Sequence, residues 1–391
     1  MHNTIQKMWD KTMKELPKDV VIYILVMLPV KSLLRLKCTC KTFCHIIKSS
    51  TFIKLHLNHT TTFKDELVLL KRSFKTDEYN FYKSILSFLF SKEDYDFKPI
   101  SPDVEIPHLT TTSACTFHRL IGPCNGLIVL TDSLTTILLN PATRKYRLIP
   151  PCPFGIPRGF RRSISGIGFG FDSDANDYKV VRLSEVYKEP CDKEMKVDIY
   201  DFSVDSWREL LGQDVPFVFW FSCAEILYKR NFHWFAFADD VVILCFDMNT
   251  EKFHNMGMPD ACHFDDGKCY GLVILFKCMT LICYPDPMPS SPTEKFTDIW
   301  IMKEYGEKES WIKRCSIRLL PESPLAVWKD EILLLQSKMG HLIAYDLNSN
   351  EVQELDLNGY PDSLRIIIYK ESLTAIPRNK DCIELQKFQM I

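Results

Sequence analysis

The chain has 391 residues, and its 46% hydrophobic and 12% aromatic content is enough for one large core and a small second module. Its formal net charge is −2, but residues 201–300 hold seven Lys and Arg against fifteen Asp and Glu. This acidic stretch argues against nucleic acid as the main ligand; it would suit a basic protein, or be a solvated surface with no particular partner. Fifteen cysteines are scattered without a CxxC pair, which favours free thiols over a disulfide framework.

Three short helices are predicted between residues 16 and 48. The pairs Leu16-Pro17 and Leu28-Pro29 each open a helix, because the missing N–H of proline is not needed at the first helical position. The run between the two pairs is apolar on nearly every face, and residues 39–48 form the third helix. Three helices of this size bury too little surface to be stable alone, so the surplus apolar surface predicts a partner protein.

Two other interpretations of this first segment stay open. Residues 20–30 follow several lysines and could form a signal peptide, but Pro17 and Asp19 precede them and no small-residue cleavage site follows. The run is also too short to span a bilayer. The segment could instead be an ordinary helical subdomain that packs on the rest of the chain.

After a polar, proline-containing connector at 91–108, one hairpin pattern recurs. An Asn or Asp ends an apolar run, and an aromatic residue or valine follows six positions later; these anchors are Asn140, Asp201, Asp247 and Asp346. Residues 300–311 look like a longer version with Gly306 in its turn. A period near 50 residues predicts a kelch-like β-propeller, with a β-sandwich as the alternative.

Few residues suggest catalysis or metal binding. Phenylalanines interleave the glycines of residues 166–170, which predicts a strand that another backbone can approach rather than a phosphate loop. The pair His233-Trp234 is expected to be a buried core element. The cysteines and histidines of residues 254–283 match no common zinc spacing, so we expect neither metal nor cofactor. Three tryptophans could instead stack on a glycan: Trp220, Trp234 and Trp300.

Several longer phrases carry a family resemblance. Residues 16–47 resemble an F-box, and the chain beyond them resembles the F-box-associated domain of plants, through the phrases GPCNGLI (122–128), LLNPATRKYRLIPP (138–151), GIGFGFDSDANDYKVV (166–181) and VDIYDFSVDSW (197–207). Residues 52–74 are similar to the S-locus F-box proteins of pollen. The chain departs from many F-boxes by Phe43 in place of tryptophan and Cys40 in place of serine, for which we expect slightly weaker packing of the third helix or weaker adaptor contact.

The resemblance implies a domain organisation and a fold. The N-terminal extension would cover residues 1–15, the all-α F-box 16–58, a connecting segment 59–107 and the mainly β F-box-associated domain 108–391. Recognition loops are expected on that scaffold at residues 151–162, 185–196, 260–268 and 285–295.

The resemblance also implies a role without bond chemistry. The chain would be the substrate receptor of a ubiquitin ligase, bound to a Skp-family adaptor and through it to a cullin and a RING protein, in the cytosol of the pollen tube or in the nucleus. Its substrates would be non-self S-RNases, or another plant protein. The residues expected at the adaptor are Leu16, Pro17, Val20, Ile24, Leu28, Pro29, Val30, Leu33 and Leu36, some of which could instead form the core of the module. Charge alone suggests substrate contacts at Asp239, Asp240, Asp265 and Asp266.

Overall fold

Four helices form a small module at the start of the part of the chain that the structure describes. The computed structural model describes residues 17–59, 66–76, 82–91, 97–106, 108–109, 118–132, 134–188, 192–219, 223, 225–262, 268–286, 296–318, 322–377 and 382–385. The helices are α2 (Lys18–Val26), α3 (Val30–Leu36), α4 (Lys41–Lys48) and α5 (Ser50–His59). The three predicted helices are confirmed, and α5 is a fourth that was not predicted as a separate helix.

The starts of these helices follow from single residues. Pro17 and Pro29 stand at the N-caps of α2 and α3 with extended backbone, so each Leu-Pro pair opens a helix as predicted, but the proline lies one residue before the first helical position. The Sγ atom of Cys40 accepts a hydrogen bond from the amide of Phe43 at 3.4 Å, so this cysteine caps α4 in place of the more usual serine. Ser49 does the same for α5, because its Oγ accepts from the amide of Phe52 at 3.2 Å.

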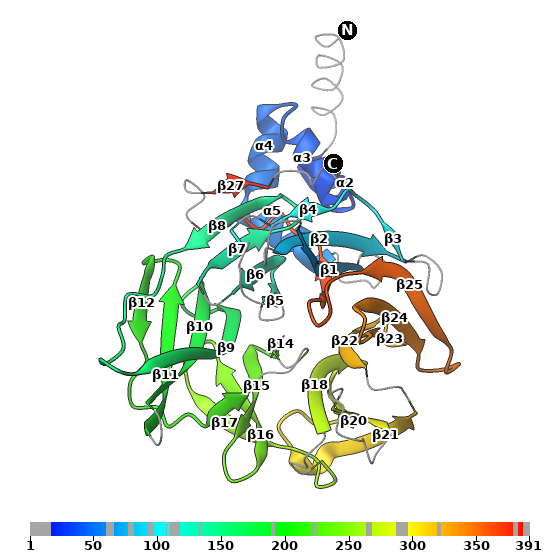
Figure 1. Cartoon of the computed structure of the whole chain (residues 1–391). Helices are drawn as coiled ribbons and strands as arrows, with labels where there is room; N and C mark the ends of the chain where they lie inside the picture. Colours follow the sequence, from blue (N-terminus) through cyan, green and yellow to red (C-terminus); the bar gives the residue numbers. More distant parts are fainter. Residues whose placement is uncertain are drawn as a thin grey trace.

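The rest of the described chain is a six-bladed β-propeller (Figure 1). Blade 1 contains β26 (Arg365–Lys370), β1 (Glu66–Lys75), β2 (Tyr82–Phe90), β3 (Lys98–Pro99) and β4 (Val104–Glu105). Blade 2 contains β5 (Arg119–Cys124), β6 (Leu127–Thr131), β7 (Thr136–Asn140), β8 (Lys145–Ile149) and β27 (Ile383–Glu384). Blade 3 contains β9 (Arg161–Asp172), β10 (Asp177–Lys188), β11 (Asp192–Asp201) and β12 (Ser206–Glu209).

The other three blades follow in chain order around the ring. Blade 4 contains β13 (Phe217–Phe219), β14 (Ile226–Tyr228), β15 (Asn231–Phe237), β16 (Val241–Asp247) and β17 (Phe253–Gly257). Blade 5 contains β18 (Lys268–Leu275), β19 (Cys278–Pro285), β20 (Thr297–Met302), the short helix η3 (Lys308–Ser310) and β21 (Trp311–Ile317). Blade 6 contains β22 (Ser323–Trp328), β23 (Ile332–Gln336), β24 (His341–Asp346) and β25 (Val352–Asn358). The predicted propeller is therefore confirmed, with a period near 50 residues.

The ring closes in blade 1, where strands from both ends of the chain meet. The late strand β26 is the innermost one, and it pairs antiparallel with the early strand β1 from Glu66 opposite Lys370 to Lys71 opposite Arg365. A second late strand, β27, covers the outer edge of blade 2 by pairing with β8. Closure of this kind leaves no open edge between the first and last blades, so the blades are stabilised as one ring.

The domain boundary expected at residue 108 needs correction. We expected residues 59–107 to be a connecting segment, but β1, β2, β3 and β4 lie within it and belong to blade 1. The propeller therefore begins at β1, and only a short stretch of chain separates its first residue, Glu66, from the last residue of α5, His59. Propeller pairing between strands almost 300 residues apart explains why the sequence pattern near residue 66 did not indicate a blade.

The recurring hairpins are confirmed as the outer hairpins of four blades. In each, the residue before the anchor is paired across the ladder with the residue six positions after the anchor, as Leu139 pairs with Tyr146. The residue four positions after each anchor has a positive φ; these residues are Arg144, Asp205, Glu251 and Asn350. A turn that ends in one left-handed residue matches the twist of an antiparallel pair. In blades 4 and 6 the anchor carboxylate also accepts hydrogen bonds from backbone amides of its own turn. Asp247, for example, accepts from the amides of Asn249 and Thr250 at 2.8 and 2.9 Å.

The glycines of β9 make room for side chains rather than for a backbone. A Cβ atom on Gly168 would lie 2.8 Å from Trp234 and 3.0 Å from Phe232, both on β15 of the next blade. Trp234 is buried and donates its indole N–H to the carbonyl of Ile167 at 3.3 Å. The predicted strand is confirmed, but the expected approach of a second backbone is wrong, because indole and phenyl rings fill that space.

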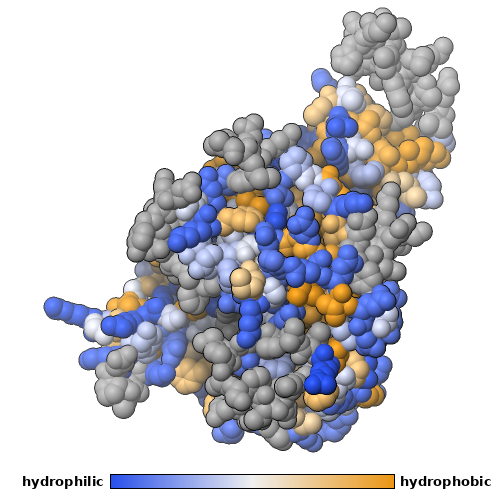
Figure 2. All heavy atoms as spheres, turned by 45° about the vertical axis from the view of Figure 1, so that its right-hand side comes forward, coloured by the Kyte–Doolittle hydropathy of each residue, from blue (hydrophilic) through white to orange (hydrophobic). Residues whose placement is uncertain are grey.

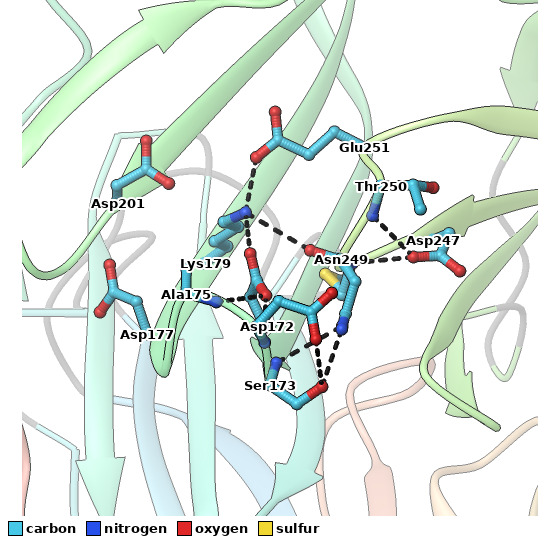
Figure 3. A network of polar contacts seen from close by, with 12 residues as sticks. Asp172, Ser173, Ala175, Asp177, Lys179, Asp201, Asp247, Asn249, Thr250 and Glu251 are labelled. Atoms are coloured by element: carbon cyan, nitrogen blue, oxygen red, sulfur yellow. Dashed lines mark hydrogen bonds and ion pairs between the residues drawn. The ribbon is translucent and has the colours of Figure 1, made fainter.

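A buried ion-pair network joins blades 3 and 4 (Figure 3). The Nζ atom of Lys179 lies 2.6 Å from Asp172 in its own blade and 2.5 Å from Glu251 in the next. Arg208 extends the network, because it lies 2.5 Å from Glu251 and 2.6 Å from Asp201. The lysine ammonium is nearly inaccessible to solvent, so both carboxylates are needed to offset its desolvation.

Candidate adaptor-binding and recognition surfaces

One face of α2 presents apolar side chains to solvent. Val20, Tyr23, Ile24 and Met27 are 42%, 65%, 49% and 54% exposed, and their spacing of three and four residues places them in one stripe along the helix. The opposite face carries Val21, Leu25 and Val26, which are buried in the core of the module. Figure 2 shows apolar surface gathered on this helical module. An apolar stripe that no residue of the described chain covers is the usual form of a helix-based docking surface.

Eight of the nine residues expected at the adaptor are described, and the structure separates them into three groups. Four are exposed: Pro17, Val20, Ile24 and Pro29. Leu28 and Leu36 are half-buried, whereas Val30 and Leu33 are fully buried in the core of the module. Leu16 lies outside the described residues. Exposed Tyr23 and Met27 were missed, although their helical spacing from Val20 and Ile24 was a usable signal.

The helical module packs directly on the propeller. Leu373, just after β26, belongs to the same buried cluster as Leu33 and Phe43, and Ala142 from the turn between β7 and β8 borders that cluster. A cleft of about 530 Å³ lies beside this contact and is lined from both domains. In Figure 1 the helices lie over the rim of the ring, beside the blades that contain β1 to β8. The stripe on α2 is therefore held in a defined position relative to the propeller.

The two ends of the propeller differ in what they carry. Connections from first to second strands leave the end that bears the helices, where Asn58 of α5 lines a cavity of about 620 Å³ together with Asn125, Lys277 and Lys329. Connections from second to third strands, and from one blade to the next, leave the opposite end because blade strands alternate in direction. Of the four segments predicted to be recognition loops, residues 151–162 lie mainly on a described connection of this second kind. Residues 185–188 and 192–196 belong to β10 and β11, and residues 189–191, 263–267 and 287–295 of the predicted segments lie outside the described residues.

The structure describes two of the four acidic residues predicted to contact a substrate. Asp239 and Asp240 are exposed in the turn between β15 and β16, at the end of the propeller opposite the helices, whereas Asp265 and Asp266 lie outside the described residues. Exposed Asp260, on the connection that leaves blade 4, lies 2.7 Å from Lys308. The pKa of Lys308 is raised mainly by its hydrogen bond to Asp260 and, to a smaller extent, by Asp240. The two acidic connections therefore act on the same lysine.

The described residues considered for catalysis and glycan stacking are packed against other side chains and form no open binding site. His233 is fully buried, with its Nε2 atom 2.8 Å from the hydroxyl of Tyr305 and its Nδ1 atom 3.2 Å from the carbonyl of Ile226. Trp234 is packed against β9 and presents no ring face to a ligand. Trp300 is half-buried beside Lys313, and Trp220 lies outside the described residues.

The cysteine-rich stretch at 254–283 forms no metal site in the described chain. Cys262 and Cys283 are buried with their sulfur atoms 2.9 Å apart. No group of three His, Cys, Asp or Glu side chains in the described ranges is arranged to hold a metal ion. Among all the described residues, no helix is long and apolar enough to cross a membrane.

The protein has a small helical module with an open apolar stripe, and this module is fixed to a closed propeller. The propeller end away from the helices carries the connections between blades. This arrangement is that of a bridging receptor, in which one domain docks on a partner and the other presents loops. Comparison with known proteins agrees with this class. Residues 13–55 match the model of the F-box domain, and residues 72–376, more than half of the chain, match the F-box associated beta propeller domain. The chain belongs to this family of F-box substrate receptors.

Its similarity to curated relatives runs along most of the chain. The chain is 27% identical to F-box protein CPR1 of Arabidopsis thaliana, over 92% of this chain and 89% of the relative. It is 26% identical to F-box protein At4g22390 and 23% to F-box/kelch-repeat protein At3g23880 of the same plant, over 87% and 85% of this chain and 85% and 89% of those proteins. Among solved structures, an oligogalacturonate lyase from Vibrio parahaemolyticus matches 74% of this chain and 78% of its own at 8% identity and a TM-score of 0.41, a likeness too weak to bear on function.

Proposed function

We propose that this F-box protein docks on a Skp-family adaptor through the α2 stripe and presents non-self S-RNases to a cullin-based ubiquitin ligase in the pollen tube. The docking half of the proposal is supported by Val20, Tyr23, Ile24 and Met27, whose apolar side chains are exposed in one line. The protein would raise the local concentration of substrate lysines near a ubiquitin thioester and form no bond itself.

The observation that carries the substrate half is a pair of acidic connections at the propeller end that faces away from the helices. Asp239 and Asp240 are exposed there, and Asp260 lies on a neighbouring connection. S-RNases are expected to be basic, so acidic loops would steer them toward this end and favour contact there. The resemblance of residues 52–74 to S-locus F-box proteins supports the same substrate class.

A binding measurement with the full-length chain and its adaptor tests the substrate half. A panel of S-RNases from different S-haplotypes is passed over the immobilised complex at low and at physiological salt. Selective binding to some members, weaker at the higher salt, is expected because exposed charges are screened. Absence of binding to every member would contradict the S-RNase assignment, and the substrate would then be another plant protein.

Charge reversal locates the contact. Asp239→Lys combined with Asp240→Lys should weaken S-RNase binding at low salt by roughly 10-fold, because two attractive charges become repulsive. The matched control reverses Asp174 and Glu331, two exposed carboxylates on first-to-second-strand connections at the helix-bearing end. Equal binding by both double variants would remove the acidic end from the proposal. If deglycosylation of the S-RNase abolishes binding while the charge variants do not, the receptor recognises glycans instead.

A further inference from the structure

The axis of the propeller contains a cavity that the receptor role does not use. It has a volume of about 200 Å³ and is walled by the inner strands of the blades, with Pro123, Ile274, Val327 and Ile368 at one side. The same four residues also line the larger cavity of about 620 Å³ beside α5. The two spaces therefore adjoin along these four residues, on the side of the channel that faces the helix-bearing end.

The channel is positively charged. Among the described residues that line it, Arg119 and Arg365 are basic and Glu225 is the acidic one. Arg119 and Arg365 are the first residues of β5 and β26, so the strand order brings them to the same end of the channel. Both arginines are more than nine-tenths buried. A net positive charge in such a place is costly unless an anion offsets it.

The one carboxylate is already committed to the channel wall. Glu225 accepts from Nη1 of Arg119 at 2.6 Å and from the amide of Ile167 at 3.1 Å. Nη2 of Arg119 donates to the carbonyls of Ile164 and Ser165 at 3.1 and 3.0 Å. Burial raises the pKa of Glu225, whereas the neighbouring Arg119 acts in the opposite direction and lowers it. The carboxyl group therefore offsets at most one of the two arginine charges.

Basic groups continue behind the lining and at the mouth. Burial, together with Lys71 and Arg365, lowers the pKa of His118 to about 3, which shows that both cations act on this imidazole. At the mouth, Lys277, Lys329 and Lys370 face two carboxylates, those of Glu66 and Asp330. The ion pair of Lys370 with Glu66 at 3.2 Å still leaves the mouth with an excess of lysines. Basic side chains therefore outnumber acidic ones both among the described lining of the channel and at the mouth, which favours an anion at each place.

We propose that the channel binds a small anionic molecule with a carboxylate or phosphate group, which enters past the lysines beside α5 and lies against Arg365 and the Arg119–Glu225 pair. Guanidinium groups match the geometry of both kinds of anion. A free small molecule fits better than a side chain of a protein substrate, because the two arginines are buried below the surface and the cavity is small. This site is independent of the identity of the ubiquitination substrate.

Thermal unfolding of the full-length chain with its adaptor tests the proposal. Inorganic phosphate, glucose 6-phosphate and succinate are added at constant ionic strength, with chloride and glucose as references. At least one of the three anions should raise Tm by about 2 °C or more in a saturable way, as expected for a ligand that binds only the folded state. Glucose should cause no such shift. If no anion differs from glucose, or if every rise is linear with concentration, the proposal is overturned.

Two variants assign the effect to the channel. Arg365→Met should lose the saturable shift, because it removes one of the two guanidinium groups that line the channel; an undiminished shift in the folded variant would overturn the proposal. If this variant does not fold, Lys277→Glu decides, since Lys277 is exposed at the mouth. It should weaken the apparent affinity by roughly 5-fold, whereas Lys252→Glu, an equal change on the exposed turn between β16 and β17, should leave it unchanged. Equal affinities of the two lysine variants would overturn the proposal.

Discussion

Leu373 of the propeller and Leu33 of the N-terminal module share one buried apolar cluster, although 340 residues of chain separate them. The module has only four short helices, so this contact supplies apolar burial that it could not provide alone. A receptor that must place a bound substrate near a ubiquitin thioester benefits from such a fixed arrangement of its two binding surfaces.

Leu373→Ala should loosen the helical module selectively. Loss of a buried leucine side chain is expected to reduce the free energy of unfolding of the module by about 2–3 kcal/mol. Hydrogen exchange measured by mass spectrometry should then become faster in α3 and α4 but remain unchanged in β16. Leu211→Ala is the control, because that leucine is 74% exposed. Exchange that rises equally in module and propeller would show that the contact does not act locally.

Ile24→Asp should disrupt adaptor binding without unfolding the chain. The side chain is 49% exposed, so its replacement should change the free energy of unfolding by less than about 0.5 kcal/mol. A carboxylate buried at the centre of an apolar interface should lower adaptor affinity by roughly 100-fold. Calorimetry on the purified variant and on Lys54→Asp, an exposed change on α5, measures the difference. Wild-type affinity of Ile24→Asp would place the adaptor elsewhere on the module.

Lys179→Met should destabilise the propeller by about 3–5 kcal/mol. The substitution removes the cation between Asp172 and Glu251 and leaves two partly buried carboxylates facing each other. Urea unfolding of the variant and of Lys252→Met, whose lysine is exposed, gives the two free energies. The network would contribute nothing to stability if both variants unfolded at the same urea concentration.

Stability should rise with pH between about 5 and 6.5. Burial lowers the pKa of both His118 and His233 to about 3, so these imidazoles stay neutral in the folded chain. In the unfolded chain they bind protons below about pH 6.5, so the unfolded state holds more protons in this window and is favoured as pH falls. Each histidine should contribute about 1 kcal/mol per pH unit to the slope of the unfolding free energy.

Urea unfolding of wild type and His233→Gln across this window separates the contribution of one histidine. The variant should have the shallower slope, because glutamine does not titrate and can still reach Tyr305 or the carbonyl of Ile226. His254→Gln, at an exposed position on β17, is the matched control and should keep most of the slope. Parallel slopes for wild type and His233→Gln would mean that buried imidazoles do not govern this pH dependence.

Local patterns were predictable because their causes are local. The outer hairpins follow from an Asn or Asp that bonds to its own turn, as Asp346 does to the amides of Asn348 and Ser349, and from one left-handed residue after it. The helix starts follow from Pro17 and Pro29. These features depend on residues within one or two turns of chain, so their residue types and spacing were sufficient evidence.

The candidate surfaces were predictable only in outline. Helix α2 is apolar on both faces, so its sequence could not distinguish buried Val21 from exposed Val20. Which face is covered depends on where α5 and the other helices pack, and that is a tertiary contact. The β1 strand was assigned to a connector for the same reason, because its partner in the inner position lies near the end of the chain.

The three predicted helices, the hairpins with their turns, the period of the blades and the apolar surplus that calls for a partner could all be read from the order of the residues. Three features became visible only in the folded chain: six blades close through β26 on β1, Val30 and Leu33 are core while Val20 and Ile24 face solvent, and Arg119, Glu225 and Arg365 line one channel. The difference lies in sequence separation, because turn and capping hydrogen bonds join neighbours in the chain, whereas ring closure and channel charge depend on which distant strands pair.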